Sequence, residues 1–195
     1  IFMALVGLET GVLRDENQII KWDREDRYVS DWNQDLTLKD AVKYSAVWYM
    51  KEVARVVGGE KVKYYIDKVN YGNRDTCGGM EDFWLSGKMR ISQEQQINFL
   101  RSLYLEKLPF SKRSIQIVKK IILVDDSSDY KIHAKTGWGE TGKLNIGWYV
   151  GWIEKSGQVY FFATNIETVK PDNDSFPKSR IAITKSILRD LKIIE

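Results

Sequence analysis

The segment Lys135-Thr136-Gly137-Trp138-Gly139 follows a short strand-like run at residues 130–134. Lysine supplies a positive charge and three hydrogen-bond donors, and threonine supplies a hydroxyl. The glycine at position 137 has no side chain, so a ligand can come close to the backbone there. The segment therefore predicts that the end of this strand forms a binding edge with a cation and a hydroxyl.

Two more strand-like runs follow, from Asn145 to Ile153 and from Gln158 to Asn165. Residues 155–157 are predicted to form a short turn between these runs, and strands joined by short turns are antiparallel. Helical patterns precede the three strands, and one more helical pattern follows them. Helices that are separated along the chain from an antiparallel sheet indicate an α+β fold rather than a doubly wound sheet.

The helices are predicted from apolar residues at helical spacing and from side chains that cap helix ends, including capping boxes of Thr37 with Asp40 and of Ser92 with Gln95. They span residues 1–10, 38–44, 47–57, 62–69, 92–104 and 111–124, with a last helix marked by Ile183, Ile187, Leu188 and Leu191. The polar segments 23–35, 74–79, 125–129 and 171–177 are predicted to be loops or turns. Residues 81–91 show no pattern that assigns them to a helix or a strand.

Length and composition indicate a globular protein with one domain over residues 1–195. The net charge of +3, from 30 basic and 27 acidic residues, is too balanced to indicate binding to nucleic acid or to an anionic membrane. No apolar run reaches the roughly 18 residues of a membrane span. Cys77 is the only cysteine, which excludes an internal disulfide, and a single histidine, His133, argues against a catalytic zinc site.

The first residues read as the middle of a helix. Phe2, Leu5 and Leu8 share one helical face, and no starting methionine, helix cap or signal peptide precedes them. We therefore expect the natural protein to be longer at its amino terminus, so that the given chain is truncated there.

Several short motifs occur in an order and at a spacing that are more specific than any one of them alone. They are Ser45-Ala46-Val47, Tyr71-Gly72-Asn73, Trp84-Leu85 followed by Arg90-Ile91-Ser92, Lys135-Thr136-Gly137, the run Gly147 to Trp152, and Arg180. In these motifs the chain resembles the class D (oxacillinase-type) serine β-lactamases of the penicillin-recognising superfamily, over nearly its whole length. The resemblance implies the α+β transpeptidase fold of that superfamily, with an antiparallel sheet and helices.

The implied activity is hydrolysis of β-lactam antibiotics through a serine acyl-enzyme. In the family, the nucleophile and a carbamylated lysine belong to a Ser-x-x-Lys motif, which by the resemblance lies immediately before Ile1. The resemblance implies no cofactor other than the CO2 of that lysine carbamate, and β-lactams as the small-molecule partners. It also implies a periplasmic or secreted location, and it leaves a homodimer open.

The resemblance implies catalytic roles for four residues of this chain. Ser45 would relay a proton between the nucleophile, Lys135 and the lactam nitrogen. Lys135 would attract the substrate carboxylate and stabilise a deprotonated hydroxyl. The main-chain N–H of Trp138 would form half of an oxyanion hole, and the Trp84 indole would donate to the lysine carbamate.

Five further residues are implied to bind substrate or to shape its site. Thr136 and Arg180 would bind the substrate carboxylate, Arg180 through its planar fork. Gly137 would let substrate approach the backbone, and Val47 and Leu85 would keep water and polar groups away from the carbamate. The site is expected between the helices that precede Ser111 and the edge strand that carries Lys135.

Each of these residues also has a purely structural interpretation. Ser45 could cap a helix, Lys135 could be a solvated strand residue, and Arg180 could be a surface arginine at a helix start. Residues 71–73 could shape the wall of the site or simply end a helix. His133 shares a strand face with Lys135 but lacks the Gly-x-Ser-x-Gly elbow of a Ser–His–Asp hydrolase, which favours a packing role.

Two other functions fit the same motifs. One is the extracellular sensor domain of a β-lactam receptor, which acylates and hardly deacylates. The other is an inactive domain that keeps the fold. The residues before Ile1 and the presence or absence of turnover would distinguish the three.

Overall fold

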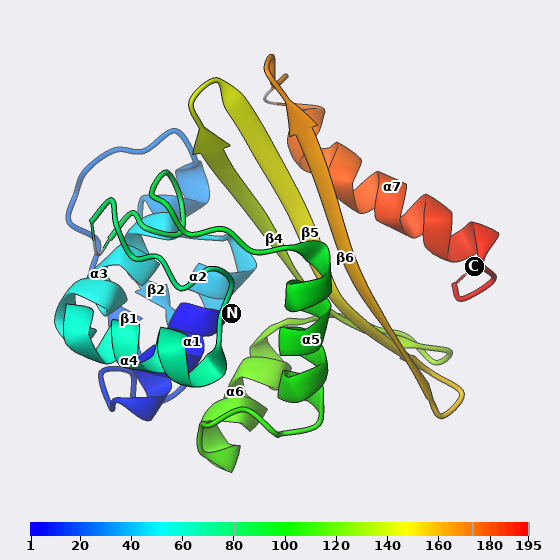
Figure 1. The fold of residues 1–195 in the computed structure, drawn as a ribbon, viewed down its shortest axis with the longest axis horizontal. Coiled ribbons are helices and arrows are strands. Elements are labelled where there is room, and N and C mark those ends of the chain that lie inside the picture. The colour runs from blue at the N-terminus through cyan, green and yellow to red at the C-terminus, as the bar shows by residue number, and fades with distance from the viewer. Residues whose placement is uncertain (80, 173, 195) are drawn as a thin grey trace.

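The computed structural model describes residues 1–79, 81–172 and 174–194 (Figure 1). Its elements are α1 (Phe2–Glu9), β1 (Ile19–Ile20), the 3-10 helix η1 (Ser30–Trp32), β2 (Leu36–Thr37), α2 (Leu38–Lys43), α3 (Val47–Val57), α4 (Gly59–Val69), α5 (Gln93–Tyr104), α6 (Lys112–Ile121), β3 (Leu123–Asp126), β4 (Lys131–Thr141), β5 (Leu144–Lys155), β6 (Gln158–Thr168) and α7 (Phe176–Asp190). The predicted domain and the predicted loop at 171–177 include residues 80, 173 or 195, which lie outside this description. The assignment of residues 1–195 to one domain stays a prediction.

An antiparallel sheet in the order β3-β4-β5-β6 separates two groups of helices. Helices α1 to α6, here called the helical layer, lie on one side of the sheet, and α7 packs alone against the other side (Figure 1). Both faces of this sheet carry apolar residues, so each face must be covered. The predicted α+β class is confirmed.

The sheet has four strands within the described residues, so the predicted number of three was wrong. The predicted helix at 111–124 ends at Ile121, and Leu123 to Asp126 form β3. The apolar run from Ile115 to Val124 concealed this change, because a short strand directly after a helix continues the same apolar composition. The polar turn predicted at 125–129 therefore begins later, after β3.

Strand β4 continues through the Lys-Thr-Gly segment to Thr141, so this segment is not the strand end that was predicted. Its register pairs Lys135 with Val150 and Gly137 with Trp148. Strand β3 pairs only with residues 131–133 of β4, so the rest of β4 is the free edge of the sheet. The predicted location of Lys135 on an edge strand is confirmed for this half of β4.

The sheet carries an apolar core on each face. The larger core lies under the helical layer and includes most of α1, whose residues 2–8 are buried. The predicted apolar face of this helix was therefore only part of its buried surface. The smaller core joins α7 to the sheet through Leu188, Tyr149 and Phe162. In addition, no helix in the described part of the chain is both long and apolar enough to cross a membrane.

Two predicted capping boxes begin helices as expected. The Thr37 side chain accepts a hydrogen bond from the Asp40 N–H at the start of α2. Ser92 and Gln95 bond reciprocally at the start of α5. The predicted loop at 171–177 extends too far, because α7 already begins at Phe176 and accepts Pro177 in its first turn, where a missing N–H costs nothing.

The described residues of the 71–92 segment, 71–79 and 81–92, connect α4 to α5 and pass along the free edge of β4. The segment folds back on itself through Asn73, whose N–H donates to the Arg90 carbonyl (2.8 Å) and whose side chain donates to the Lys88 carbonyl (2.9 Å). Gly72 has a positive φ of 57° at this crossing, and a Cβ there would collide with the Arg90 carbonyl oxygen. The Tyr-Gly-Asn motif thus closes the segment that faces the sheet.

We expect Gly72→Ala to lower the free energy of unfolding by more than the matched variant Gly142→Ala. Both glycines have φ near 60°, but no atom lies within 4 Å of a Cβ built at Gly142. The control therefore isolates the cost of the left-handed backbone, about 1 kcal/mol. The collision should add at least about 1 kcal/mol at Gly72. If urea unfolding showed equal losses of free energy for the two variants, the close approach of Gly72 to the Arg90 carbonyl would not constrain the segment.

Candidate active site

A cavity of about 470 Å³ lies where the helical layer and the 71–92 segment meet β4 and β5. Its lining includes eight of the nine predicted site residues: Ser45, Val47, Trp84, Leu85, Lys135, Thr136, Gly137 and Trp138. Its volume falls within the usual range for small-molecule sites. Arg180, the ninth residue, does not line the cavity.

The centre of the cavity is a contact between Lys135 and Ser45, which are 90 residues apart in the chain. The Lys135 ammonium donates a hydrogen bond to the Ser45 hydroxyl. The Thr136 hydroxyl lies 3.2 Å from the same Ser45 oxygen, and Lys135 also donates to the Thr136 carbonyl at 2.9 Å. Two hydroxyls and one amine therefore lie within hydrogen-bond reach of one another, as a proton relay requires.

Ser45 occupies the junction between α2 and α3 in a left-handed backbone conformation, with φ of 55°. A non-glycine residue in such a conformation costs about 1–3 kcal/mol and persists only where its surroundings hold it. Here the Ser45 N–H donates to the Val42 carbonyl and the Ala46 N–H donates to the Ala41 carbonyl. The strained turn brings the hydroxyl to β4, so a cap alone does not account for this serine.

The environment of Lys135 changes its acid–base behaviour. Burial, with a smaller effect from the charge of Arg180, lowers the pKa of Lys135 to about 7 from its ordinary 10.5. Desolvation favours the uncharged amine, and a nearby cation acts in the same direction. Near neutral pH the amine can therefore both accept a proton and donate one, which a solvated strand lysine could not do.

The backbone N–H of Trp138 points towards the cavity. Along β4, the N–H of Ala134 donates to Ile122 and the N–H of Glu140 donates to Leu85, both on the free-edge side. Alternate residues of a strand direct their N–H groups to the same side, so Trp138, between these two in the alternation, shares that direction. The Trp138 indole donates to the Asn145 side-chain oxygen at 2.9 Å.

Arg180 lies in α7, behind the Lys-Thr-Gly segment rather than at the cavity surface. Its side chain is buried, and Nη1 donates to the Gly137 carbonyl at 2.9 Å. Its Nε is buried without a partner in the parts of the chain that the structure describes. Arg180 is therefore not the surface arginine of the structural interpretation. It supports the strand backbone directly behind the cavity.

Trp84, Leu85 and Val47 line the inner part of the cavity. The Trp84 ring packs edge-on against Phe83 with a centroid distance of 4.8 Å. Within the described ranges the Trp84 indole N–H has no hydrogen-bond partner, so it remains available to an acceptor in the cavity. The two aliphatic side chains keep this region apolar.

Sequence reasoning missed several residues of the cavity wall. They include Ile1, Met50, Met89, Gln93, Gln96, Ile146, Trp148, Val150 and Asn165. Ile146, Trp148 and Val150 alternate along β5, so the period of a strand could have placed them on the face of Lys135. The glutamines could not have been found, because their position depends on where α5 docks. Tyr71 also lines the cavity and bonds to Gln96 (3.3 Å), so its motif both ends α4 and shapes the wall.

His133 lies outside the cavity and packs in the core. Its ring stacks on Trp152 with a centroid distance of 4.7 Å, and Nδ1 bonds to the Lys119 carbonyl at 2.9 Å. Burial lowers its pKa. The packing role expected for this histidine is confirmed. No group of three or more His, Cys, Asp or Glu side chains in the described residues is arranged to hold a metal ion.

Comparison with known proteins places these features in one family. The family described as the penicillin binding protein transpeptidase domain matches residues 1–190. The β-lactamase OXA-10 of Pseudomonas aeruginosa is 41% identical over 194 residues, which cover 98% of this chain and 72% of that protein. The β-lactamase OXA-48 of Klebsiella pneumoniae is 43% identical over 191 residues, which cover 98% of this chain and 71% of that protein.

Solved structures show the same similarity in three dimensions. The crystal structure of a class D β-lactamase from Sebaldella termitidis has a TM-score of 0.94 and 39% identity, covering 100% of this chain and 79% of that one. The resemblance inferred from the motifs is therefore matched by both sequence and fold.

We expect the unfolding free energy to rise between pH 7 and 10 through Lys135. Its pKa of about 7 in the folded protein lies below its ordinary value of 10.5, so the unfolded chain binds more protons in this window and stability rises with pH. Lys135→Met should remove on the order of 2 kcal/mol of that rise. The control Lys143→Met removes an exposed charge from the turn after β4 and should keep the rise. Parallel pH curves for both variants would refute a buried, uncharged amine.

Proposed function

The chain belongs to the class D β-lactamases, and we propose that it acts in the hydrolysis of β-lactam amides through a serine acyl-enzyme. The observation that carries this proposal is the meeting of the Lys135 amine with the hydroxyls of Ser45 and Thr136 in one cavity. An anionic substrate with a strained amide needs a cation, a proton relay and oxyanion donors at one place. This cavity offers all three types of group.

In acylation, a serine hydroxyl attacks the lactam carbonyl, a new C–O bond forms and the ring C–N bond breaks. The proton of the attacking hydroxyl is transferred to the nitrogen that leaves. Ser45 and Lys135 carry that proton, because the lowered pKa of Lys135 lets its amine both take and return it. The Trp138 N–H stabilises the negative charge that develops on the carbonyl oxygen.

We propose that the attacking serine and its general base precede Ile1 in the full protein. Ile1 lines the same cavity as Ser45 and Lys135, so a chain that continues before Ile1 lies next to the relay. The general base is proposed to be a carbamylated lysine, which when formed would supply a carboxylate-like acceptor for the proton of the attacking serine in acylation and of water in deacylation. The unpartnered Trp84 indole and the apolar Val47 and Leu85 suit such a group, because they offer one donor in a region poor in water.

Substrate binding is proposed to rest on the carboxylate that β-lactams carry. Thr136 offers a hydroxyl at the cavity surface and Lys135 a positive charge. Gly137 leaves room for the substrate to run along the strand edge. Arg180 adds positive charge from behind this edge, and its unpartnered Nε is the group that a shift of its side chain could bring to the carboxylate.

A periplasmic or secreted location, a contribution to antibiotic resistance and a homodimer stay predictions of the resemblance. Cell fractionation of the natural host and measured susceptibility of cells that express the protein would test the first two. Sedimentation of the purified protein would test the third.

Rapid mixing of the full-length protein with a chromogenic cephalosporin tests the proposal. We expect release of product to continue at a steady rate after the first turnover. A burst of one equivalent without further turnover would instead identify a sensor that acylates. Absence of any product release would identify an inactive domain, and either result would overturn the proposed hydrolysis.

Trp84→Phe is expected to slow deacylation more than acylation, because it removes the indole N–H that is proposed to hold the carbamate. Deacylation should fall about tenfold at ambient CO2 and recover in part when bicarbonate is added. A 13C-carbamate signal in NMR spectra of protein supplied with labelled bicarbonate should weaken in the variant. An unchanged signal, with no response to bicarbonate, would contradict this role.

A further inference from the structure

The backbone of the strained turn that contains Ser45 is held from outside by Trp32. The Trp32 indole N–H donates to the carbonyl of Tyr44 at 2.9 Å, directly before Ser45. The indole N–H of Trp48, in the first turn of α3, donates to the Trp32 carbonyl at 3.1 Å. These two hydrogen bonds, here called the Trp32 brace, connect Tyr44 and Trp48, at the two ends of residues 44–48, to Trp32.

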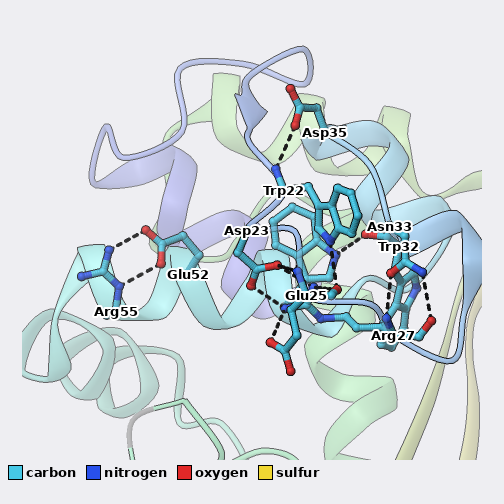
Figure 2. A network of polar contacts seen from close by, with 10 residues as sticks. Trp22, Asp23, Glu25, Arg27, Trp32, Asn33, Asp35, Glu52 and Arg55 are labelled. Atoms are coloured by element: carbon cyan, nitrogen blue, oxygen red, sulfur yellow. Dashed lines mark hydrogen bonds and ion pairs between the residues drawn. The ribbon is translucent and has the colours of Figure 1, made fainter.

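Trp32 itself is fixed in a loop that has no regular secondary structure around it apart from η1. Asn33 bonds twice to the Arg27 backbone, at 2.9 and 3.0 Å, and so closes the loop next to Trp32 (Figure 2). Arg27 in turn forms a two-bond ion pair with Asp23, at 2.8 and 2.6 Å (Figure 2). This forked geometry orders the loop more firmly than a single bond would.

The same arginine also ties the loop to α3. The Arg27 guanidinium lies 5.5 Å from the centre of the Trp48 ring, a cation–π distance. Only 15% of the Arg27 side chain is exposed, so this contact and the ion pair are partly shielded from solvent. The loop that contains Arg27 is therefore linked to α3 by this contact as well as by the Trp32 brace.

The Trp32 brace acts on the backbone directly before Ser45. Trp32 is 9% exposed and does not line the cavity, so direct contact with a substrate there does not explain its two bonds. The carbonyl that it holds belongs to the peptide unit that leads into Ser45. Rotation of that unit would relax the left-handed conformation and move the Ser45 hydroxyl relative to Lys135 and Thr136.

We propose that Trp32 is a positioning residue of the reaction, which acts through Tyr44 to hold the Ser45 hydroxyl in line with Lys135. The inference rests on the proposed function, because it assumes that Ser45 relays the proton in acylation. Proton relays lose rate steeply when a donor moves by a fraction of an ångström to one ångström. The loop at 22–35, which is far from the Lys-Thr-Gly segment in the chain, thereby contributes to the rate of acylation.

Trp32→Phe removes the indole N–H and keeps an aromatic ring in the core. In full-length protein we expect the acylation rate constant to fall roughly tenfold, with the dissociation constant of the non-covalent substrate complex unchanged within about twofold. The matched control is Trp22→Phe, which removes a similar indole bond, from Trp22 to the Glu25 carbonyl at 3.0 Å in the same loop (Figure 2). The control should acylate at the normal rate.

The Ser45→Ala background separates positioning from general loosening of the fold. With the Ser45 hydroxyl absent, Trp32→Phe should change the remaining acylation rate by less than about twofold. If Trp32→Phe costs the same factor in both backgrounds, or if it matches Trp22→Phe, the proposal is overturned.

Trp48→Phe provides a second test if Trp32→Phe does not fold in thermal melts. It breaks the other bond of the brace and should show the same loss of acylation and the same dependence on Ser45. A normal acylation rate in this variant would overturn the brace. Unmodified protein that fails to acylate would instead refute the proposed function, so the two failures can be told apart.

Discussion

The contact between the Lys135 amine and the Ser45 hydroxyl is the interaction on which the architecture of this site depends. It joins the sheet to the helical layer at the part of β4 that pairs with β5 on one side and lies beyond the pairing with β3 on the other. An amine at this point loses hydration, and its pKa falls to about 7 as a result. The elements around this contact hold the Lys135 amine and the Ser45 hydroxyl together.

Several parts of the fold offset the free-energy cost of burying the Lys135 amine and of holding Ser45 in a left-handed conformation. The helical layer supplies a large apolar core that fixes α2 and α3. Hydrogen bonds from Trp32 and within the α2–α3 junction hold Ser45 in its left-handed conformation. On the other side of the sheet, Arg180 anchors the Gly137 carbonyl and adds positive charge behind Lys135. Elements from the start, middle and end of the chain therefore meet at one small site.

Capping pairs and apolar periodicity in the sequence predicted most helices well. They failed where an apolar helix runs directly into an apolar strand. The capping pairs at Thr37 and Ser92 were reliable because they act within one turn of helix. The run from Ile115 to Val124 was misleading because helix α6 and strand β3 are both apolar and directly adjacent. The extent of β4 was missed because its continuation to Thr141 depends on pairing with β5.

The sequence by itself determined the α+β class, the chemical groups of the site and their family, since capping, periodicity and motif order are local properties. Only the tertiary structure decided that Arg180 supports β4 from behind, that His133 is a core residue and that the Trp32 indole bonds to the carbonyl before Ser45. Burial, strain and pKa arise from atoms brought together by packing over long distances in the chain. No pattern of neighbouring residues contains that information.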